Sequence, residues 1–361
     1  MSKKVLIGMS GGVDSSVAAY LLKEQGYEVT GITLKMWSEK LYEKRKGCTF
    51  TPHDCDDDAK KVANRLGIEH ISLNYEEFFK KYVVDYFTDA YINGKTPNPC
   101  IECNRYIKFG AMLDYALDNG YDYIATGHYA GIEFDNNEGL YKLKKSVYGS
   151  KDQTYVLYTL TQHQLKHTLM PLYDYSKDEI RKIAEDKIGL FIANKSDSME
   201  ICFIPDNNYQ DFICDTTGYV QKEGNFVDTS GNVIGKHNSV INFTIGQRKG
   251  LGMTFGKPMF VTDIDANTNT VTLGEAHEVY SNSLEAEKVN MISGKAICEP
   301  FKCFCKTRYS AKMTECTVYP LESGNIKVTF AEKQRAVTKG QSVVLYDGDF
   351  VIGGAIICKV D

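Results

Sequence analysis

Apolar and polar positions along the first third of the chain follow a repeating strand–helix order. Four short apolar runs have the length of strands: 4–9, 27–36, 68–73 and 121–126. Four further segments carry apolar residues at helical spacing: 14–25, 56–66, 76–92 and 103–118. This alternation predicts an α/β domain with a parallel sheet, whose ligands bind at the carboxyl ends of the strands.

Shorter elements follow this region. Residues 131–145 predict a hairpin, 176–187 a helix that begins with a capping box, and 199–204 a short strand. After about residue 210 the helical spacing fades, and the segments 343–345 and 351–357 predict a terminal hairpin. We therefore predict three domains: an α/β domain over 1–209, a small central domain over 210–284 and a C-terminal β-barrel over 285–361.

The composition is that of an ordinary globular protein. Of the 361 residues, 43% are hydrophobic and 25% are charged, and no apolar run approaches the roughly 20 residues that span a bilayer. We expect a cytoplasmic protein with no membrane partner. The formal net charge is −5, yet the segments 40–46, 141–151 and 302–312 are locally basic, so the sequence does not exclude a surface for nucleic acid.

The first predicted strand ends in the loop Ser10-Gly-Gly-Val-Asp-Ser-Ser16. Its two glycines let the backbone turn and approach an anion, and the amides of the following helix favour phosphate. The serine hydroxyls add donors, and the Asp14 carboxylate could hold Mg²⁺. The loop lacks both the lysine of a Walker P-loop and the Rossmann glycine pattern, which disfavours those two classes of site.

This loop resembles the PP-loop of the N-type ATP pyrophosphatases, a superfamily that cleaves ATP between the α and β phosphates and adenylates an oxygen atom. The resemblance implies an adenine nucleotide alpha hydrolase-like fold that uses ATP and Mg²⁺. The loop alone does not distinguish members that activate small molecules, such as NAD and GMP synthetases, from members that act on tRNA.

Three of the eleven cysteines stand in motifs that suggest chemistry: Cys100, Cys103 and Cys202. Cys103 lies at the predicted start of a helix, where the helix N-terminus lowers a thiol pKa and favours the nucleophilic thiolate. Cys202 follows about a hundred residues later, in the segment 197–205. Two distant cysteines, a site for ATP and local basic segments suit the delivery of sulfur to a nucleic acid.

Further motifs make the resemblance closer. In chain order they are TPNPxxxCNxxIKF (96–109), ATGHY (125–129), KDQTY (151–155), ICFI (201–204), TIGQRKGLG (244–252) and KTRY (306–309). From residue 5 to about 357 the chain resembles the tRNA-specific 2-thiouridylase (MnmA/TrmU) family in the order and spacing of these motifs. That family has a PP-loop domain, a small central domain and a C-terminal β-barrel that contacts tRNA.

The resemblance implies a role for each matching position. It places ATP at Gly8, Met9, Ser10, Gly11, Gly12, Val13, Asp14, Ser15, Leu34 and Gly127. It places the target uracil beside Asn98, Pro99 and Cys100, and it places tRNA at Lys151, Asp152, Gln153, Arg308 and Tyr309. Cys103 is the expected nucleophile, and Cys202 is expected to receive the persulfide.

The implied reaction is the ATP-dependent 2-thiolation of the wobble uridine in tRNAs for Lys, Glu and Gln. ATP adenylates the C2 oxygen of a flipped-out uridine, and a persulfide on Cys202 delivers sulfur to C2. Cys103 attacks the persulfide and leaves a Cys103–Cys202 disulfide, or it helps to expel the sulfur during transfer. The sequence does not identify the sulfur donor, which is either a cysteine desulfurase or a sulfur-relay protein.

One position departs from the family, because many members have aspartate where this chain has Cys100. Three interpretations stay open. Cys100 takes over an acid–base or thiol role, or it forms a resting disulfide with Cys103. In the third interpretation, Cys100, Cys103 and Cys202 ligate a [4Fe–4S] cluster whose open iron presents sulfide.

The remaining cysteines carry weaker signals. Three lie in apolar or alternating stretches typical of core thiols: Cys214, Cys316 and Cys358. Two groups have spacings that match no zinc finger and stay unassigned: Cys48 with Cys55, and Cys298 with Cys303 and Cys305. The rival functions are a PP-loop enzyme for a small molecule and a redox-sensing or iron–sulfur RNA-binding protein that adds no sulfur.

Overall fold

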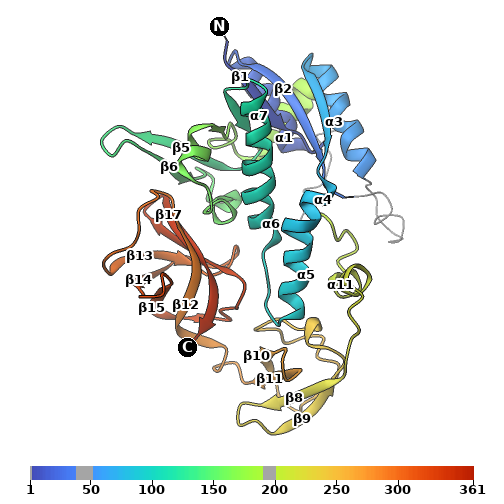
Figure 1. Ribbon diagram of the computed structural model, residues 1–361, viewed down its shortest axis with the longest axis vertical. Coiled ribbons are helices and arrows are strands. Elements are labelled where there is room, and N and C mark those ends of the chain that lie inside the picture. Colours follow the sequence, from blue (N-terminus) through green and yellow to red (C-terminus); the bar gives the residue numbers. More distant parts are fainter. Residues whose placement is uncertain (1, 38–51, 190–200) are drawn as a thin grey trace.

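The computed structural model describes residues 2–37, 52–189 and 201–361. The basic segment 40–46 and Cys48 lie outside the described residues, as does the side chain of Cys55. Figure 1 shows a parallel sheet at the top, a β-barrel at the lower left and a small central sheet at the bottom. This arrangement confirms the predicted fold class.

A five-stranded parallel sheet organises the N-terminal part, in the order β3–β2–β1–β4–β7. Its strands are β1 (Lys4–Gly8), β2 (Glu28–Lys35), β3 (Glu69–Asn74), β4 (Tyr123–Ala125) and β7 (Thr168–Leu169). Val5, Leu6 and Ile7 are fully buried, because β1 lies between β2 and β4 and helices cover both faces. Burial on both faces explains why this strand is an unbroken apolar run.

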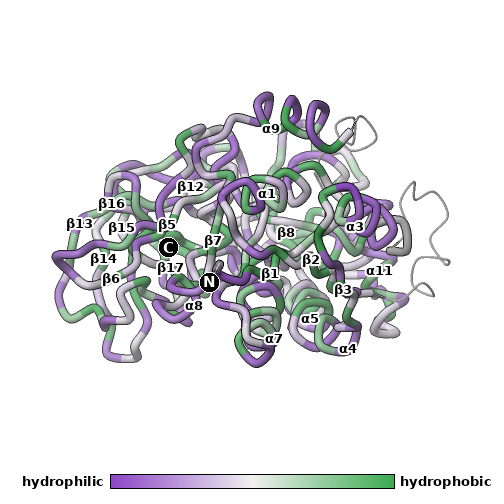
Figure 2. Tube along the Cα trace, turned by 90° about the horizontal axis from the view of Figure 1, so that it is seen from above, coloured by the Kyte–Doolittle hydropathy of each residue, from purple (hydrophilic) through white to green (hydrophobic). Residues whose placement is uncertain are grey.

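Helices cover the two faces of this sheet (Figure 2). One face carries α1 (Val13–Glu24), α3 (Pro52–Leu66) and α9 (Lys177–Ile183), the last continued by a π-helical segment, Ala184–Ile188. The other face carries one continuous helix composed of α6 (Pro99–Glu102), a π-helical segment (Cys103–Ala111) and α7 (Met112–Asp118). Val17 and Val62 pack in the first of these cores, and Phe109 and Met112 pack in the second, as expected for amphipathic helices.

A second long helix leads from the sheet to the central domain. It runs through α4 (Glu76–Phe79), a π-helical segment (Lys80–Val84) and α5 (Asp85–Ile92). The central sheet has the order β10–β11–β8–β9, made of β8 (Gly224–Asp228), β9 (Val233–His237), β10 (Phe260–Asp265) and β11 (Thr270–Gly274). Phe87 of α5 packs on Phe203, and Phe203 packs on Phe212 of α11 (Tyr209–Thr217), with ring centroids 5.4 and 5.3 Å apart. These rings join the first two domains through one apolar core.

The C-terminal strands form a closed barrel. They are β12 (Tyr280–Met291), β13 (Phe301–Lys306), β14 (Thr314–Pro320), β15 (Ile326–Arg335), β16 (Ser342–Asp347) and β17 (Phe350–Val360). Their order is β12–β15–β14–β13–β16–β17, and β12 pairs again with β17. The predicted hairpin, β5 (Ala130–Asp135) and β6 (Leu140–Lys145), continues this sheet, because β6 pairs with β17. A hairpin from the N-terminal part is therefore an extension of the barrel sheet, which the sequence pattern did not predict.

Several short elements complete the fold. They are α8 (Gln162–Lys166) and the 3₁₀ turns Gly149–Lys151, Thr154–Val156 and Val240–Asn242. The strand predicted over 199–204 is wrong in its described part, because residues 201–204 form a turn in which the amide of Ile204 donates to the carbonyl of Ile201 at 2.9 Å. Within the described ranges, no helix has the length and apolar character needed to cross a bilayer.

Candidate active site

The glycine–serine loop connects β1 to α1, as predicted. Gly11 has φ +67°, a conformation that glycine adopts without strain, and α1 begins one residue after Gly12. Ser15 Oγ accepts the amide of Ser10 at 3.2 Å, and Ser16 Oγ donates to the carbonyl of Gly12 at 2.7 Å. The side chains thus hold the loop in shape, while the first amides of α1 form the positive end of a helix that suits phosphate.

Gly127 lies against the start of α1. A Cβ atom at Gly127 would be 2.9 Å from both the carbonyl carbon of Asp14 and the amide nitrogen of Ser15. The turn after β4 therefore touches the loop, which explains the need for glycine. Leu34 lies near the end of β2, the strand beside β1, so the expected ATP positions share one edge of the sheet.

Asp14 is held by two partners from other parts of the chain. Lys177, the first residue of α9, places its Nζ 2.8 and 3.0 Å from the two carboxylate oxygens. The Tyr129 hydroxyl donates to the same carboxylate at 2.7 Å. One carboxylate beside a phosphate-binding loop fits Mg²⁺, which usually takes one or two carboxylates and completes its shell with phosphate and water. A cation at Asp14 would compete with Lys177.

The helix that carries Cys103 begins earlier than predicted. Asn98 is the N-cap residue of α6, its side-chain oxygen accepts the amide of Cys100 at 3.1 Å, and Pro99 occupies the first turn. Cys103 thus lies one turn inside the helix, and the prediction that the helix N-terminus lowers its thiol pKa is wrong. Burial instead raises the pKa of Cys103 to about 11, an effect that Lys108 partly opposes and that the charge of Cys100 increases.

Cys100 and Cys103, three residues apart, meet the distant Cys202 near Lys108. Burial among protein atoms raises the pKa of Cys202, and the charges of Cys103 and Cys100 raise it further, while Lys108 opposes the rise. Burial also raises the pKa of Cys100, again opposed by Lys108. As whole residues Cys100 and Cys202 are exposed and Cys103 is buried, and all three are free cysteines. The thiols are thus close enough for their charges to interact, and Lys108 is the cation that favours their thiolates.

The arrangement of these thiols does not fit the proposed metal cluster. In the described ranges, no three His, Cys, Asp or Glu side chains are arranged so that they could hold a metal ion. Cys100, Cys103 and Cys202 therefore do not form a ligand set as they stand, and we derive no chemical step from a [4Fe–4S] cluster. The resting disulfide between Cys100 and Cys103 is also not formed in this structure.

The residues expected to contact tRNA differ in how they are held. Asp152 is 7% exposed, and its carboxylate accepts the hydroxyl of Thr154 at 2.8 Å. Gln153 Oε1 accepts the amide of Tyr129 at 3.0 Å, and Lys151 ends a 3₁₀ turn. Asp152 and Gln153 thus form hydrogen bonds that hold the backbone beside the glycine–serine loop. Their motif did not indicate this structural role.

Arg308 and Tyr309 follow β13 in the barrel. The guanidinium of Arg308 donates to the carbonyl of Ile245 in the central domain at 3.0 Å and also to the hydroxyl of Thr338. Tyr309 is 45% exposed. Burial raises the pKa of Tyr309, and the charges of Asp152 and Cys100 add to the rise, so the ring lies near the cysteine site. Tyr309 is therefore available for stacking, whereas Arg308 is anchored to a neighbouring domain.

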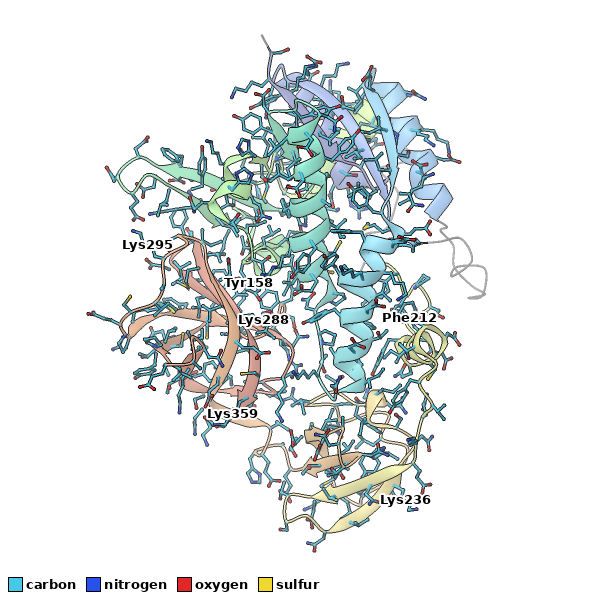
Figure 3. The ribbon with its side chains drawn as sticks, viewed as in Figure 1. Tyr158, Phe212, Lys236, Lys288, Lys295 and Lys359 are labelled. Atoms are coloured by element: carbon cyan, nitrogen blue, oxygen red, sulfur yellow. The ribbon has the colours of Figure 1, made fainter. Side chains whose placement is uncertain are left out.

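Sequence reasoning missed two groups at this site. Lys177 lies in a predicted helix with no motif of its own, and only the fold brings it to Asp14. Gln341 of the barrel donates from Nε2 to the carbonyl of Thr96 at 2.9 Å, and so holds the loop before Asn98. The barrel also contacts the N-terminal domain at Tyr158, which is labelled in Figure 3. The Tyr158 hydroxyl lies 3.1 Å from Ser342 Oγ of the barrel. None of these contacts has a local sequence signal.

Comparison with known proteins covers nearly the whole chain. Three family models match: the tRNA methyl transferase HUP domain over residues 3–206, the tRNA methyl transferase PRC-barrel domain over 210–275 and the aminomethyltransferase beta-barrel domain over 281–357. The chain is 54% identical over 358 residues to the tRNA-specific 2-thiouridylase MnmA of Acetivibrio thermocellus, covering 98% of this chain and 99% of that protein. It is 53% identical over 360 residues to the protein of the same name from Clostridioides difficile, covering 99% of each.

Among solved structures, a predicted subunit of tRNA methyltransferase from Methanocaldococcus jannaschii matches 51% of this chain and 76% of its own. The sequence identity is 19% and the TM-score is 0.31. The NMN synthetase of Francisella tularensis matches 60% of this chain and 78% of its own, at 17% identity and a TM-score of 0.35.

Proposed function

The chain belongs to the tRNA-specific 2-thiouridylase family, and from that premise we propose that it thiolates C2 of the wobble uridine in tRNAs for Lys, Glu and Gln, using ATP and Mg²⁺. The observation that carries the proposal is the meeting of Cys103 and Cys202 near Lys108, on a domain whose first strand ends in an anion-binding loop. A site for ATP alone would not need the two thiols.

In the proposed first step, the phosphates of ATP lie at the loop 8–15 and the amides that open α1. The C2 oxygen of the uridine attacks the α-phosphorus, and pyrophosphate leaves. This step activates C2 for the later substitution, because AMP is a far better leaving group than an amide-like oxygen. Asn98, Pro99 and Cys100 form the rigid, capped start of α6 beside which the flipped base would bind.

In the proposed second step, Cys202 carries a persulfide received from a cysteine desulfurase or a sulfur-relay protein. The terminal sulfur attacks C2, and the bond from C2 to the AMP oxygen breaks. The Cys103 thiolate then attacks the Cys202 sulfur, which forms a Cys103–Cys202 disulfide and leaves the terminal sulfur on C2. Two cysteines are oxidised, so a thiol reductant must restore them before the next turnover.

The charge state of the thiols supports this order of events. Because burial raises the pKa of Cys103 to about 11, its thiol is mostly neutral near pH 7 and does not react before the site is filled. Lys108 is the described cation that lowers the pKa of all three cysteines, so it is the residue that favours the attacking thiolate.

The test is an anaerobic assay with wobble-unmodified tRNA, Mg–ATP and either sulfide or a persulfide donor, with and without added iron. Digested RNA is analysed for 2-thiouridine by mass spectrometry. The wild type is compared with Cys100→Ser, Cys103→Ser and Cys202→Ser, and Cys214→Ser serves as the matched control.

A persulfide relay predicts activity without iron when a persulfide donor is present, and loss of product in Cys103→Ser and Cys202→Ser but not in Cys214→Ser. Product that requires iron and all three cysteines would replace the relay with cluster chemistry. Absence of 2-thiouridine under every condition, with AMP formed on another substrate, would reject the tRNA function.

A further inference from the structure

A second group of thiols lies in the barrel, away from the candidate active site. Cys303 of β13 stands directly opposite Cys316 of β14 in the antiparallel pairing. Their sulfur atoms are 3.6 Å apart, and neither is bonded covalently. Cys305, two residues after Cys303, lies on the same face of the sheet. We call Cys303, Cys305 and Cys316 the barrel thiols.

The barrel thiols interact chiefly with one another. The thiols of Cys303 and Cys305 each form a hydrogen bond with the Cys316 sulfur, and these bonds lower the pKa of Cys316 and raise the pKa of Cys303 and Cys305. The three thiols are not arranged to hold a metal ion, and the same is true of every other group of three His, Cys, Asp or Glu side chains in the described residues. Their remaining shared chemistry is the formation and exchange of disulfides.

We propose that Cys303 and Cys316 are a redox modification site, which a low-molecular-weight disulfide converts into a cross-strand disulfide. The proposal rests on the opposed strand positions and the 3.6 Å sulfur separation. Neighbouring antiparallel strands hold Cα atoms about 4.5–5.5 Å apart, within the range that a disulfide spans, so the bond needs only side-chain movement.

Accessibility sets the order of the reaction. Cys303 is partly exposed, whereas Cys316 is 4% exposed and Cys305 is fully buried. Cys303 passes its proton to the Cys316 sulfur, attacks the small disulfide and forms a mixed disulfide. The small thiolate that leaves takes up this proton and departs as a thiol. The Cys316 thiolate then attacks the Cys303 sulfur, which forms the internal bond and releases the second thiol. The oxidant gains two electrons, and the two cysteines lose them.

The bond has a structural consequence at the end of the hairpin. The residues between β13 and β14 are 307–313, the loop that holds Arg308 and Tyr309. A covalent link between the two strands restricts this loop in the unfolded and partly opened states. Oxidation is therefore expected to slow amide exchange in 307–313 and to raise the thermal midpoint of the whole chain by a few degrees.

The experiment treats the full-length folded protein with hydroxyethyl disulfide, blocks free thiols with iodoacetamide and maps tryptic peptides without reduction. The expected product links the peptide 303–306 to the peptide 313–327. The peptide 303–306 holds two cysteines, so the Cys305→Ser variant shows which of them is bonded to Cys316. If Cys303 forms the bond, the link persists in this variant. Cys316→Ser is expected to abolish it, and Cys303→Ser to leave only a slow link through the buried Cys305.

Two results would overturn the proposal. One is that Cys303 and Cys316 are recovered as separately alkylated or mixed-disulfide species while Cys298, an exposed thiol, has reacted. The other is a link that persists undiminished in Cys303→Ser and is lost in Cys305→Ser, which would assign the bond to Cys305. If Cys316→Ser fails to fold, the double variant Cys303→Ser/Cys305→Ser takes its place, since it removes both possible partners and keeps the buried sulfur.

Discussion

At the scale of single residues, Lys177 pairs with Asp14, the carboxylate of the loop that we propose binds phosphate. Lys177 is 13% exposed, and its ammonium also lies 5.9 Å from the ring centroid of Tyr129. A phosphate and a metal ion entering the loop would each favour one member of the pair, because Mg²⁺ prefers the carboxylate and an ammonium binds phosphate. Lys177 is thus positioned to exchange Asp14 for a nucleotide phosphate.

We expect Lys177→Met to weaken ATP binding by about 10- to 100-fold, the usual cost of losing a hydrogen bond between charged groups. Lys177→Arg keeps the charge and should recover part of the loss. Calorimetric titration with Mg–ATP measures the effect, and Lys182→Met, an exposed lysine of the same helix, is the control. If Lys177→Met and the control bind Mg–ATP with equal affinity, the ion pair stabilises only the loop without nucleotide.

The raised pKa of Cys103 predicts a steep pH dependence of its reactivity. Because its pKa is about 11, the thiolate fraction and the rate of alkylation by iodoacetamide should rise about tenfold per pH unit from pH 7 toward pH 11. Lys108→Met removes the cation that lowers this pKa, so the same rate should fall at every pH in that range. Mass spectrometry of the modified peptide gives the rate, and a rate that levels off near pH 8 would contradict the prediction.

At the scale of elements, close packing joins the turn after β4 to the start of α1. The site would lack space for a side chain at Gly127, because the nearest neighbours of a Cβ atom are backbone atoms of Asp14 and Ser15, which cannot move aside. The geometry of the loop 8–15 thus depends on an element that follows it by more than a hundred residues.

Gly127→Ala should therefore destabilise the fold by about 1–3 kcal/mol, the usual cost of overpacking, and should weaken ATP binding in the same variant. Gly149→Ala is the matched control, because a Cβ atom there meets nothing within 4 Å. Urea unfolding gives the free energy of unfolding of each variant. If the two variants are equally stable and bind ATP with equal affinity, the contact of the turn with α1 is required neither for stability nor for ATP binding.

At the scale of the whole molecule, the barrel is bound to the other two domains. Its β17 pairs with β6, Gln341 reaches the loop before Asn98, and Arg308 bonds to the carbonyl of Ile245. All three contacts use backbone carbonyls, which any residue presents. The residues expected to contact tRNA thus lie on the N-terminal domain and on the barrel, and these contacts hold the two together.

Because Arg308 is anchored in this way, Arg308→Ala should lower the thermal midpoint of the free protein by a few degrees and also weaken tRNA binding. The slope of log Kd against log salt should stay unchanged, whereas loss of a phosphate contact reduces that slope by about one. Lys312→Ala, an exposed lysine of the same hairpin loop, is the control for general loss of charge. A reduced slope with an unaltered midpoint would instead make Arg308 a direct phosphate contact.

Much of the fold follows from local patterns. The unbroken apolar run of β1, the amphipathic spacing of α1 and the capping box of Ser176 and Glu179 each have a short-range physical cause, and each element is present. The two errors also have local causes. Asn98 and Pro99 start the helix a turn before Cys103, and residues 201–204 form a turn in which the Phe203 ring packs on α5.

The sequence by itself therefore determined the parallel sheet, the phosphate-favouring loop and the separate motifs around Cys103 and Cys202, because each of these depends on residues close together in the chain. Only the tertiary structure decided that Lys177 meets Asp14, that Cys202 meets Cys103 near Lys108 and that Cys303 faces Cys316. Those contacts join residues on separate elements, and they depend on sheet order, strand register and burial, which no local pattern contains.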